Sequence, residues 1–245
     1  MSAIRGARER ARIEVTAAIK EEARRQLAAD GAVKLSLRAV ARELGMVSSA
    51  LYRYFPSRDD LLTALIVDAY DAMGEAAESA RATPGGSAGP HAARWAEVAC
   101  AVRAWALAHP HEYALIYGSP VPGYTAPQDT VGPASRVGLV LIGLARDAHL
   151  GEGLAVARLP GELRPEAERM AADLAPDLPP AAVAALVAAW AQLFGLISFE
   201  VFGQFDRVVE ARDLFFRQAA RDLARSAGLP DGPAGDAGRP DDARP

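Results

Sequence analysis

The sequence predicts an all-α fold, with a three-helix head at the N-terminal end and a longer helical body after it. Alanine is the dominant residue, and runs of β-branched or aromatic residues are sparse, which favours helices over strands. Apolar residues recur at helical spacing between segments rich in glycine and proline. With 51% hydrophobic and 24% charged residues among 245, the chain is typical of a globular protein with a sizeable core.

The first helix is expected from Arg8 to about Ala29, after a loose basic arm at residues 1–7. Its apolar residues recur at every fourth position, which places them on one face. Asp30-Gly31 then ends the helix, because glycine accepts the backbone conformation that terminates helices. The apolar face consists of Val15, Ile19, Ala23 and Leu27.

A second helix is expected from Leu37 to Leu44, where four apolar residues share one face. Ser36 stands before this face and can cap the first turn. Gly45 follows the last apolar residue, in a position where glycine is favoured. A helix, a glycine turn and a further helix are the layout of a helix-turn-helix, whose second helix enters the DNA major groove.

The third helix is expected from Ser48 to Tyr54, with Leu51 and Phe55 pointing inward. Its outward residues are small or hydroxylated at the start and are followed by an arginine and tyrosines, which suit contacts with phosphates and base edges. Any two short packed helices would show the same apolar spacing, so spacing alone leaves both interpretations open. Ser57 and Asp60 then form a capping-box pattern that starts the fourth helix.

The stretch from Glu9 to Met73 resembles the DNA-binding domain of TetR-family transcriptional regulators. The resemblance is carried by Ala39–Ala41, by Gly45-Met46 and by LYRYFPSR at residues 51–58, which runs into Leu61-Leu62. The spacing of leucine, tyrosine and phenylalanine in the third of these motifs is the most specific part. The resemblance implies a DNA-binding head and a helical body that binds a ligand and dimerises.

The resemblance also implies roles for individual residues. Ser36 matches a hydroxyl that touches phosphate, and Arg58 matches a basic residue that grips the DNA backbone. Val47 stands where the family commonly has serine or threonine as a helix cap, so we expect Ser48 to take over the cap. The predicted DNA-contacting residues are Ser36, Arg38, Ser48, Ser49, Ala50, Tyr52, Arg53, Tyr54 and Arg58.

The distribution of charge is consistent with the DNA-binding hypothesis. The whole chain carries a net charge of −4, but residues 1–60 hold twelve Lys or Arg and eight Asp or Glu, a net of +4. The remainder therefore carries −8. A basic end can meet phosphates while an acidic remainder stays off the duplex, although a split of this size is common in unrelated proteins.

The fourth helix is expected to link the head to the body, because its apolar stripe continues from Leu62 to Met73. A loop at residues 82–90 follows it. Further helices are expected at 91–109, from Pro110, at 136–150, near 166–174, from Pro180 and at 207–227, with an irregular segment at 118–135. The chain is thus divided into a helix-turn-helix domain at 8–55, a regulatory and dimerisation domain at 56–227 and a disordered tail at 228–245.

The long helix from Pro180 carries an apolar seam at heptad spacing, together with a second apolar face. The uncharged stretch 179–199 is long enough to cross a bilayer, but it is alanine-rich and lacks flanking basic clusters. We therefore expect it to be buried on two sides, with a partner subunit covering one face in a homodimer. The predicted interface residues are Val183, Val187, Trp190, Phe194, Ile197, Val201 and Phe215.

Aromatic residues also recur between residues 95 and 117 and form a candidate ligand pocket. A core stripe with a satisfied histidine is the structural alternative. The order Trp105, His109, Gly118 resembles the WHG-type C-terminal domain of some TetR regulators, which implies an effector but does not identify it. The predicted ligand-binding residues are Trp95, Trp105, His109, Tyr113 and Tyr117.

Enzymatic and metal-dependent functions find little support. No nucleophile elbow, phosphate-cradling glycine loop or zinc-protease motif is present. Cys100 lies in an apolar helix, and with His109 and His111 it matches no metal-ligand spacing. As the single cysteine it forms no internal disulfide, and the N-terminal stretch shows no signal peptide, so a cytoplasmic location is expected.

Together these patterns predict a ligand-responsive DNA-binding regulator, and a repressor rather than an activator. It would bind a palindromic operator in double-stranded DNA as a homodimer, without a cofactor or metal ion. An effector would move the fourth helix and so change the separation of the two heads. The alternatives are a constitutive architectural DNA-binding protein without an effector and a small-molecule-binding enzyme.

Overall fold

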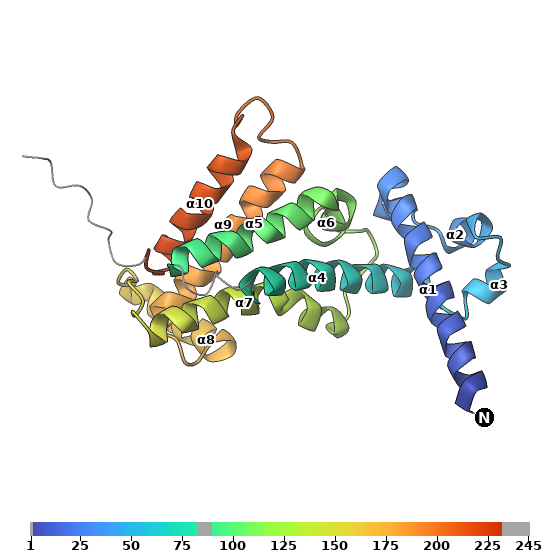
Figure 1. Ribbon diagram of the computed structural model, residues 1–245, viewed down its shortest axis with the longest axis horizontal. Coiled ribbons are helices and arrows are strands. Elements are labelled where there is room, and N and C mark those ends of the chain that lie inside the picture. Colours follow the sequence, from blue (N-terminus) through green and yellow to red (C-terminus); the bar gives the residue numbers. More distant parts are fainter. Residues whose placement is uncertain (1, 83–89, 232–245) are drawn as a thin grey trace, which may run out of the picture. The chain divides into compact units, whose positions relative to one another are not determined.

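The computed structural model describes residues 2–82 and 90–231, and within these ranges every regular element is a helix (Figure 1). The predicted all-α fold is therefore confirmed for the described chain. Most of the expected loop at 82–90, and the tail from residue 232, lie outside the described residues. The elements are α1 (Ser2–Asp30), η1 (Ala32–Lys34), α2 (Leu37–Glu43), α3 (Ser48–Leu51), α4 (Arg58–Ala82), α5 (His91–Ala108), α6 (Pro110–Tyr117), η3 (Gln128–Thr130), α7 (Val131–Leu150), η4 (Gly161–Leu163), α8 (Arg164–Leu174), α9 (Pro180–Val201) and α10 (Arg212–Ser226).

The chain forms two compact units. The first consists of the residues up to Gly74 together with Trp105–Arg136, and the second consists of Glu75–Ala104 and the residues from Val137 onward. Three helices, α4, α5 and α7, contribute residues to both units. The first unit therefore contains the helix-turn-helix and also α6 with the glycine- and proline-rich segment that follows it.

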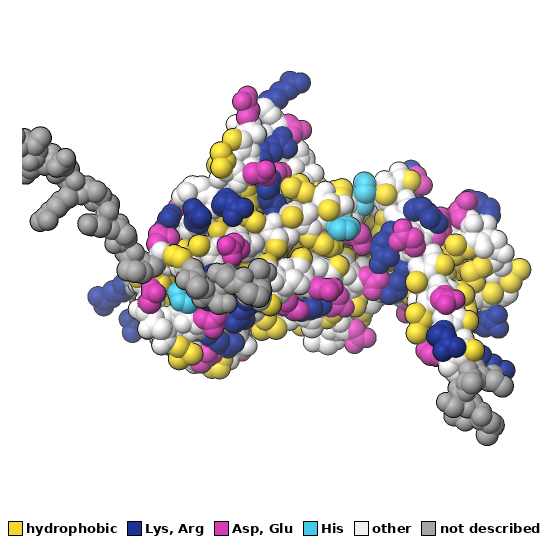
Figure 2. Space-filling model, in the orientation of Figure 1, with side chains coloured by type: hydrophobic (Ala, Val, Ile, Leu, Met, Phe, Trp, Pro, Cys, Tyr) yellow, Lys and Arg dark blue, Asp and Glu magenta, His cyan; other side chains and the backbone are white. Residues whose placement is uncertain are grey.

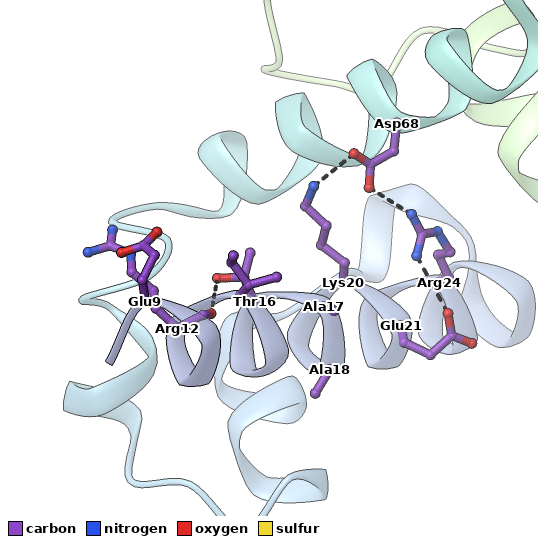
Figure 3. A pocket seen from close by; sticks show the side chains of 10 residues that line it. Glu9, Arg12, Thr16, Ala17, Ala18, Lys20, Glu21, Arg24 and Asp68 are labelled. Carbon is purple, nitrogen blue, oxygen red and sulfur yellow. Dashed lines mark hydrogen bonds and ion pairs between the residues drawn. The ribbon is translucent and has the colours of Figure 1, made fainter. Parts of the chain in front are cut away.

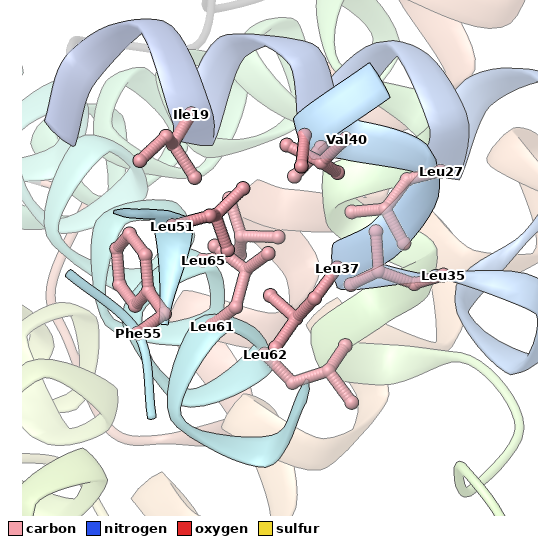
Figure 4. Packing of buried hydrophobic residues seen from close by; sticks show 12 residues of the cluster. Ile19, Leu27, Leu35, Leu37, Val40, Leu51, Phe55, Leu61, Leu62 and Leu65 are labelled. Atoms are coloured by element: carbon pink, nitrogen blue, oxygen red, sulfur yellow. The ribbon is translucent and has the colours of Figure 1, made fainter. Parts of the chain in front are cut away.

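One apolar cluster, the head cluster, holds the helix-turn-helix together (Figure 4). It draws side chains from α1, from α2 and α3, from the first turns of α4, and from Leu35 and Phe55 in the connecting segments. Leu51 is fully buried and Phe55 is 6% exposed, so the inward orientation predicted for both is confirmed. The large members of the cluster are Ile19, Leu27, Leu35, Leu37, Val40, Leu51, Phe55, Leu61, Leu62 and Leu65.

Two predicted helix boundaries in the head are wrong. The expected loose arm at residues 1–7 is helical from Ser2, because alanine, arginine and glutamate are good helix formers and let α1 continue. The third helix ends at Leu51 instead of Tyr54. Residues 52–54 form a turn there, and the Phe55 N–H donates to the Leu51 carbonyl at 3.1 Å. The residue before a proline is disfavoured in helical conformation, and Pro56 follows directly.

The prediction also places the start of the disordered tail, at residue 228, too early in the chain. Leu229 is 2% exposed, and the carbonyl of Gly228 accepts a hydrogen bond from the Ala155 N–H at 3.0 Å. The Pro230 carbonyl accepts another from the Ala92 N–H at 3.1 Å. Residues 228–230 are thus packed within the second unit.

Helix α9 is the central helix of the second unit, where it packs against α8 and α10. It is long and apolar enough to span a membrane by composition. Its buried stripe runs through Leu186, Leu193 and Ile197 to Glu200. Leu186 and Leu193 belong to the second apolar face of the prediction, whereas Ile197 was expected in the interface seam and Leu196, the third residue of that second face, is half-buried. Because α9 packs against α8 and α10, this stripe is part of the core of the second unit.

The predicted interface seam is therefore only partly exposed. Val183, Phe194 and Ile197 are buried within the chain and belong to its own core, which corrects their expected placement at an interface. A helix that is apolar almost all round does not reveal which face packs inward. Trp190 and Phe215 are exposed, and Val187 and Val201 are half-buried.

A buried ion pair connects α5 to α9. The Arg103 guanidinium donates to both carboxylate oxygens of Glu200 at 2.6 Å, and it donates to Asp213 of α10 at 2.7 Å. The same guanidinium lies over the Phe216 ring, with its carbon 5.1 Å from the ring centroid. The hydrogen bonds to Glu200 are the largest of several influences that raise the pKa of Arg103.

We expect Glu200→Ala to lower the free energy of unfolding by about 3 kcal/mol, the lower end for breaking a buried ion pair. The Glu200 side chain is only 4% exposed, and its loss leaves the buried Arg103 charge with one carboxylate. Urea unfolding measures the change. The control is Asp213→Ala, which removes a carboxylate that is 90% exposed and should change the stability by less than about 1 kcal/mol. Equal losses in the two variants would contradict this assignment.

Candidate nucleic-acid interface

The start of α2 and the turn after it have the predicted local structure. The Ser36 hydroxyl accepts a long hydrogen bond, of 3.5 Å, from the Ala39 N–H and so caps the first turn. Gly45 has a φ of 62°, a left-handed conformation that suits glycine. The Met46 N–H then donates to the Ala41 carbonyl at 2.8 Å, which closes the end of the helix.

The start of α3 differs from the prediction. Val47 occupies the cap position, with an extended backbone and no side-chain hydrogen bond to the helix. Ser48 is the first helical residue, so the expectation that Ser48 takes over the cap is wrong. Val47 is 70% exposed, which leaves an apolar side chain beside the open face of α3.

The outward residues predicted for α3 lie mainly on its open face. Ser48, Ser49 and Arg53 are exposed, Tyr52 is 41% exposed, and Ala50 is half-buried. Tyr54 differs from these residues, because it is half-buried and packs against the head cluster. The predicted set therefore remains largely accessible to a partner.

Residues from three elements meet at one shallow hollow of about 430 Å³ beside α3. Ser36 and Arg38 line it from the start of α2, Tyr52 from the end of α3, and Arg58 from the start of α4. Ser57 also lines the hollow, so three hydroxyls and two guanidinium groups around one surface depression provide donors suited to phosphate oxygens. The fold thus brings together five residues that are scattered over 23 positions of the sequence.

Arg58 also forms hydrogen bonds and an ion pair inside the head. Its guanidinium donates to the carbonyls of Ala32 at 2.8 Å and Leu35 at 3.2 Å, and it lies 3.5 Å from the Asp59 carboxylate. These bonds fasten the segment before α2 to the start of α4. The predicted capping box is confirmed beside it, since the Asp60 N–H donates to the Ser57 hydroxyl at 3.1 Å.

Two arginines of the helix-turn-helix are free of carboxylate partners. Arg38 and Arg53 form no ion pair within residues 2–82 and 90–231, whereas Arg42 pairs with Glu43 at 3.3 Å. Figure 2 shows basic side chains around α1 and the short helices, interspersed with acidic ones. An unpaired guanidinium on an open surface retains its capacity to bind phosphate.

Comparison with known proteins agrees with this geometry. The family described as "Bacterial regulatory proteins, tetR family" matches residues 19–65, and the "Tetracyclin repressor-like, C-terminal domain" matches residues 95–223. The HTH-type transcriptional regulator Rv1816 of Mycobacterium tuberculosis is 42% identical over 212 residues, which cover 82% of this chain and 86% of the relative. The chain belongs to the TetR family.

Solved structures agree with the TetR assignment. The regulatory protein SCO4313 aligns with a TM-score of 0.74 and 35% identity, over 88% of this chain and 97% of that one. A protein of unknown function from Rhodococcus sp. RHA1 aligns with a TM-score of 0.65 and 25% identity, over 88% and 95% of the two chains. This TetR-family protein is thus a DNA-binding transcriptional regulator with a helix-turn-helix.

The aromatic residues predicted to bind the effector are not gathered around one pocket. Trp95 belongs to the second unit and is fully buried in its core. In the first unit Trp105 stacks on His109, and the buried Tyr113 stacks on Tyr117, with ring centroids 5.2 Å apart in both pairs.

The described residues contain no group of three or more His, Cys, Asp or Glu placed to hold a metal ion.

A different pocket, of about 570 Å³, lies in the first unit of this TetR-family protein. Helix α4 contributes Ile66 and Tyr70, and Tyr124 comes from the segment between α6 and α7. None of the residues that line it is charged. Sequence periodicity could not place it, although a tyrosine inside a glycine- and proline-rich segment was a usable signal. The remaining lining residues are Leu115, Ile116, Gly118, Ser119, Pro120, Val121, Ala126, Thr130, Val131, Ala134 and Ser135.

Proposed function

We propose that this regulator binds a palindromic operator as a homodimer and acts as a ligand-responsive repressor in the cytoplasm. The observation that carries the proposal is the open face of α3, flanked by the hollow that Ser36, Arg38, Tyr52 and Arg58 line. The match to a tetracyclin repressor-like domain supports repression over activation. Names of relatives as transcriptional regulators support action on cytoplasmic DNA.

Base reading is assigned to the exposed residues of α3. Ser48 and Ser49 are small enough to allow close approach of the helix, and the unpaired Arg53 can reach a base edge or a phosphate. Because α3 has only four helical residues, one head reads few base pairs. Two heads in a two-fold dimer read half-sites about 34 Å apart, one turn of the duplex.

We expect Arg53→Ala to weaken operator binding by about 1–3 kcal/mol, the range for removing an arginine that binds a base. The operator is first selected from a pool of random duplexes, which should yield an inverted repeat. Fluorescence anisotropy then compares the wild type with the variant, and Arg158→Ala serves as the control because Arg158 is exposed in the second unit. Equal affinity of the wild type for selected and scrambled duplexes at physiological salt would refute the proposal.

Dimerisation is assigned to the face of α9 that points away from its own core. Ala188, Ala191 and Gly195 are exposed along it and continue into Phe199 and Phe202, which are 54% and 43% exposed. Small residues allow two helices to approach closely, while exposed aromatic side chains gain by burial. Phe215 of α10 extends the same apolar surface through edge contacts with Phe205.

We expect Ala191→Glu to convert the dimer to a monomer, because a carboxylate would be buried without a partner at the centre of this face. Analytical ultracentrifugation at micromolar concentration measures the change. The matched control is Ala172→Glu on α8, where the alanine is also exposed and lies outside the proposed interface. A monomeric wild type, or a variant that still sediments as a dimer, would count against the interface.

The effector site is assigned to the uncharged pocket between α4, α6 and α7. Its lining combines apolar walls with the hydroxyls of Tyr70, Tyr124 and Ser135, which suits a neutral, largely apolar molecule with a few polar groups. The Tyr70 phenol is protonated at neutral pH and can donate a hydrogen bond, and burial raises its pKa further. A charged effector would find no opposite charge among these residues.

The pocket shares side chains with the packing of the head. Leu115, Val121 and Tyr124 line the pocket and also pack against the head cluster. The Tyr124 hydroxyl lies 2.9 Å from the Thr63 hydroxyl of α4, within hydrogen-bond distance. A molecule that displaces these side chains, or moves α4, would alter the head and thereby the spacing of the two heads in the dimer.

We expect neutral apolar compounds that raise the melting temperature of the wild type to have little effect on Ala134→Trp, because the indole would fill the pocket. Ala134 is half-buried at the start of α7, so the variant should fold and bind the operator normally. Thermal shift and anisotropy measurements on the same compound panel test both properties. Equal stabilisation of the two proteins would place the effector elsewhere, and a panel without effect on either would favour a constitutive architectural protein.

A further inference from the structure

Helix α1 extends well beyond the core of the head. The helix begins at Ser2, whereas Val15 is the first of its residues that packs against the head cluster. Residues 7–14 are all exposed. From Arg8 to Val15 the helix rises by roughly 10 Å, at about 1.5 Å per residue. These turns contribute nothing to the buried core and remain available as a surface.

The extension carries three arginines without carboxylate partners. Arg8, Arg10 and Arg12 are exposed and form no ion pair within the part of the chain that the structure describes. In Figure 3 the only bond drawn at Arg12 is made by its backbone carbonyl, which accepts from the Thr16 hydroxyl at 2.8 Å. Glu9 lies on the same turns, and among the described residues it also lacks an ion pair.

The packed half of α1 uses its basic residues differently. Lys20 pairs with Asp68 of α4 at 2.8 Å, as Figure 3 shows, and Arg24 pairs with Asp68 at 2.7 Å. Arg24 also reaches Glu112 of α6 at 3.1 Å. The cations in this half are therefore neutralised inside the first unit, and the unpaired ones are concentrated in the extension.

The spacing of these arginines gives their direction relative to the head. Arg8 and Arg12 precede Val15 and Ile19 by steps of four, three and four residues, so the four side chains share one helical stripe. Ile19 is fully buried in the cluster that also holds Leu51 of α3 (Figure 4). Beyond the core the same stripe presents guanidinium groups on the side of α1 where the short helices pack.

We propose that the Arg8–Arg12 segment of α1 is a second DNA contact, which binds backbone phosphates next to the half-site read by α3. The inference rests on the proposed DNA-reading function of α3. Guanidinium groups bind phosphate oxygens through two parallel hydrogen bonds, and such contacts depend little on base sequence. The segment thus adds affinity and salt dependence without adding specificity, and a homodimer carries it twice.

The test is the salt dependence of operator binding by the full-length double variant Arg8→Gln/Arg12→Gln. The slope of log affinity against log salt should fall by about 0.9 for each phosphate that the variant no longer neutralises, so by up to roughly 3–4 for the dimer. At about 0.1 M salt the affinity should drop tenfold or more. The ratio of affinities for operator and scrambled duplex should stay within a factor of about two, because phosphate contacts carry no sequence information.

Two further double variants serve as controls. Arg8→Lys/Arg12→Lys retains both charges and should retain most of the slope. Arg158→Gln/Arg217→Gln removes the same charge from exposed positions of the second unit and should leave the slope unchanged. All of these substitutions are at exposed positions, and a melting temperature within about 2 °C of the wild type confirms that folding is intact.

The outcomes separate this inference from the proposed function. A wild-type slope in Arg8→Gln/Arg12→Gln, combined with weakened binding by Arg53→Ala, overturns the second contact and leaves the reading role of α3 in place. An equal loss of slope in Arg158→Gln/Arg217→Gln overturns it as well, because general electrostatics would then explain the effect. If the wild type selects no sequence from the random pool, the proposed function itself fails.

Discussion

The reading surface depends on the burial of Leu51. Helix α3 has four residues, Ser48–Leu51, and a helix of one turn has no stability of its own in water. It persists because Leu51 is fully enclosed by α1, α2 and α4, a burial that contributes roughly 2 kcal/mol. Every exposed position on α3 is therefore oriented by one buried side chain, with Phe55 fixing the exit of the chain. The side chains proposed to contact DNA are therefore positioned by the packing of the head cluster beneath them.

This dependence would give the proposed effector a direct route to the reading surface. Leu115, Val121 and Tyr124 contact the head cluster on one side and line the uncharged pocket on the other. A close-packed core transmits small displacements, because its side chains have few empty spaces into which they can relax. The proposed effector response therefore requires only that a bound molecule move side chains already in contact with the core around Leu51.

Periodicity in the sequence predicted the head well, because each short helix there has one apolar face and one polar face. The pattern of Leu51 and Phe55 indicated which face of the third helix points inward, and the pairing of Ser57 with Asp60 indicated where the fourth helix begins, although the spacing alone left the DNA-binding role open. Helix α9 was different, because apolar residues surround most of it and either stripe could have been the core. The structure buries the stripe through Leu186 and Leu193, and part of the predicted seam became interior with it.

The pocket could not be predicted for another reason. Its lining comes from Ile66 on α4, from Leu115 on α6, from Tyr124 in an irregular segment and from Ala134 on α7. Spacing along one helix relates residues three or four positions apart, whereas these are brought together by the packing of separate elements. The aromatic residues between 95 and 117 shared a sequence pattern, yet much of that pattern reflects core packing and stacking.

The sequence alone also could not show which basic side chains are available to bind a partner, whereas the ion pairs of the structure do. Counting charges gave residues 1–60 an excess of four, which is a weak signal because it does not say which cations are available. Ion pairs divide them: Arg24, Arg25 and Arg42 have carboxylate partners, and Lys20 and Lys34 pair as well. Within the described residues, the unpaired arginines of this segment are confined to the extension of α1, to α2 and to the turn after α3. Among the described residues of this segment, the cations that the fold leaves without carboxylate partners are Arg8, Arg10, Arg12, Arg38 and Arg53, and these, together with Arg58 at the hollow, are the proposed phosphate contacts.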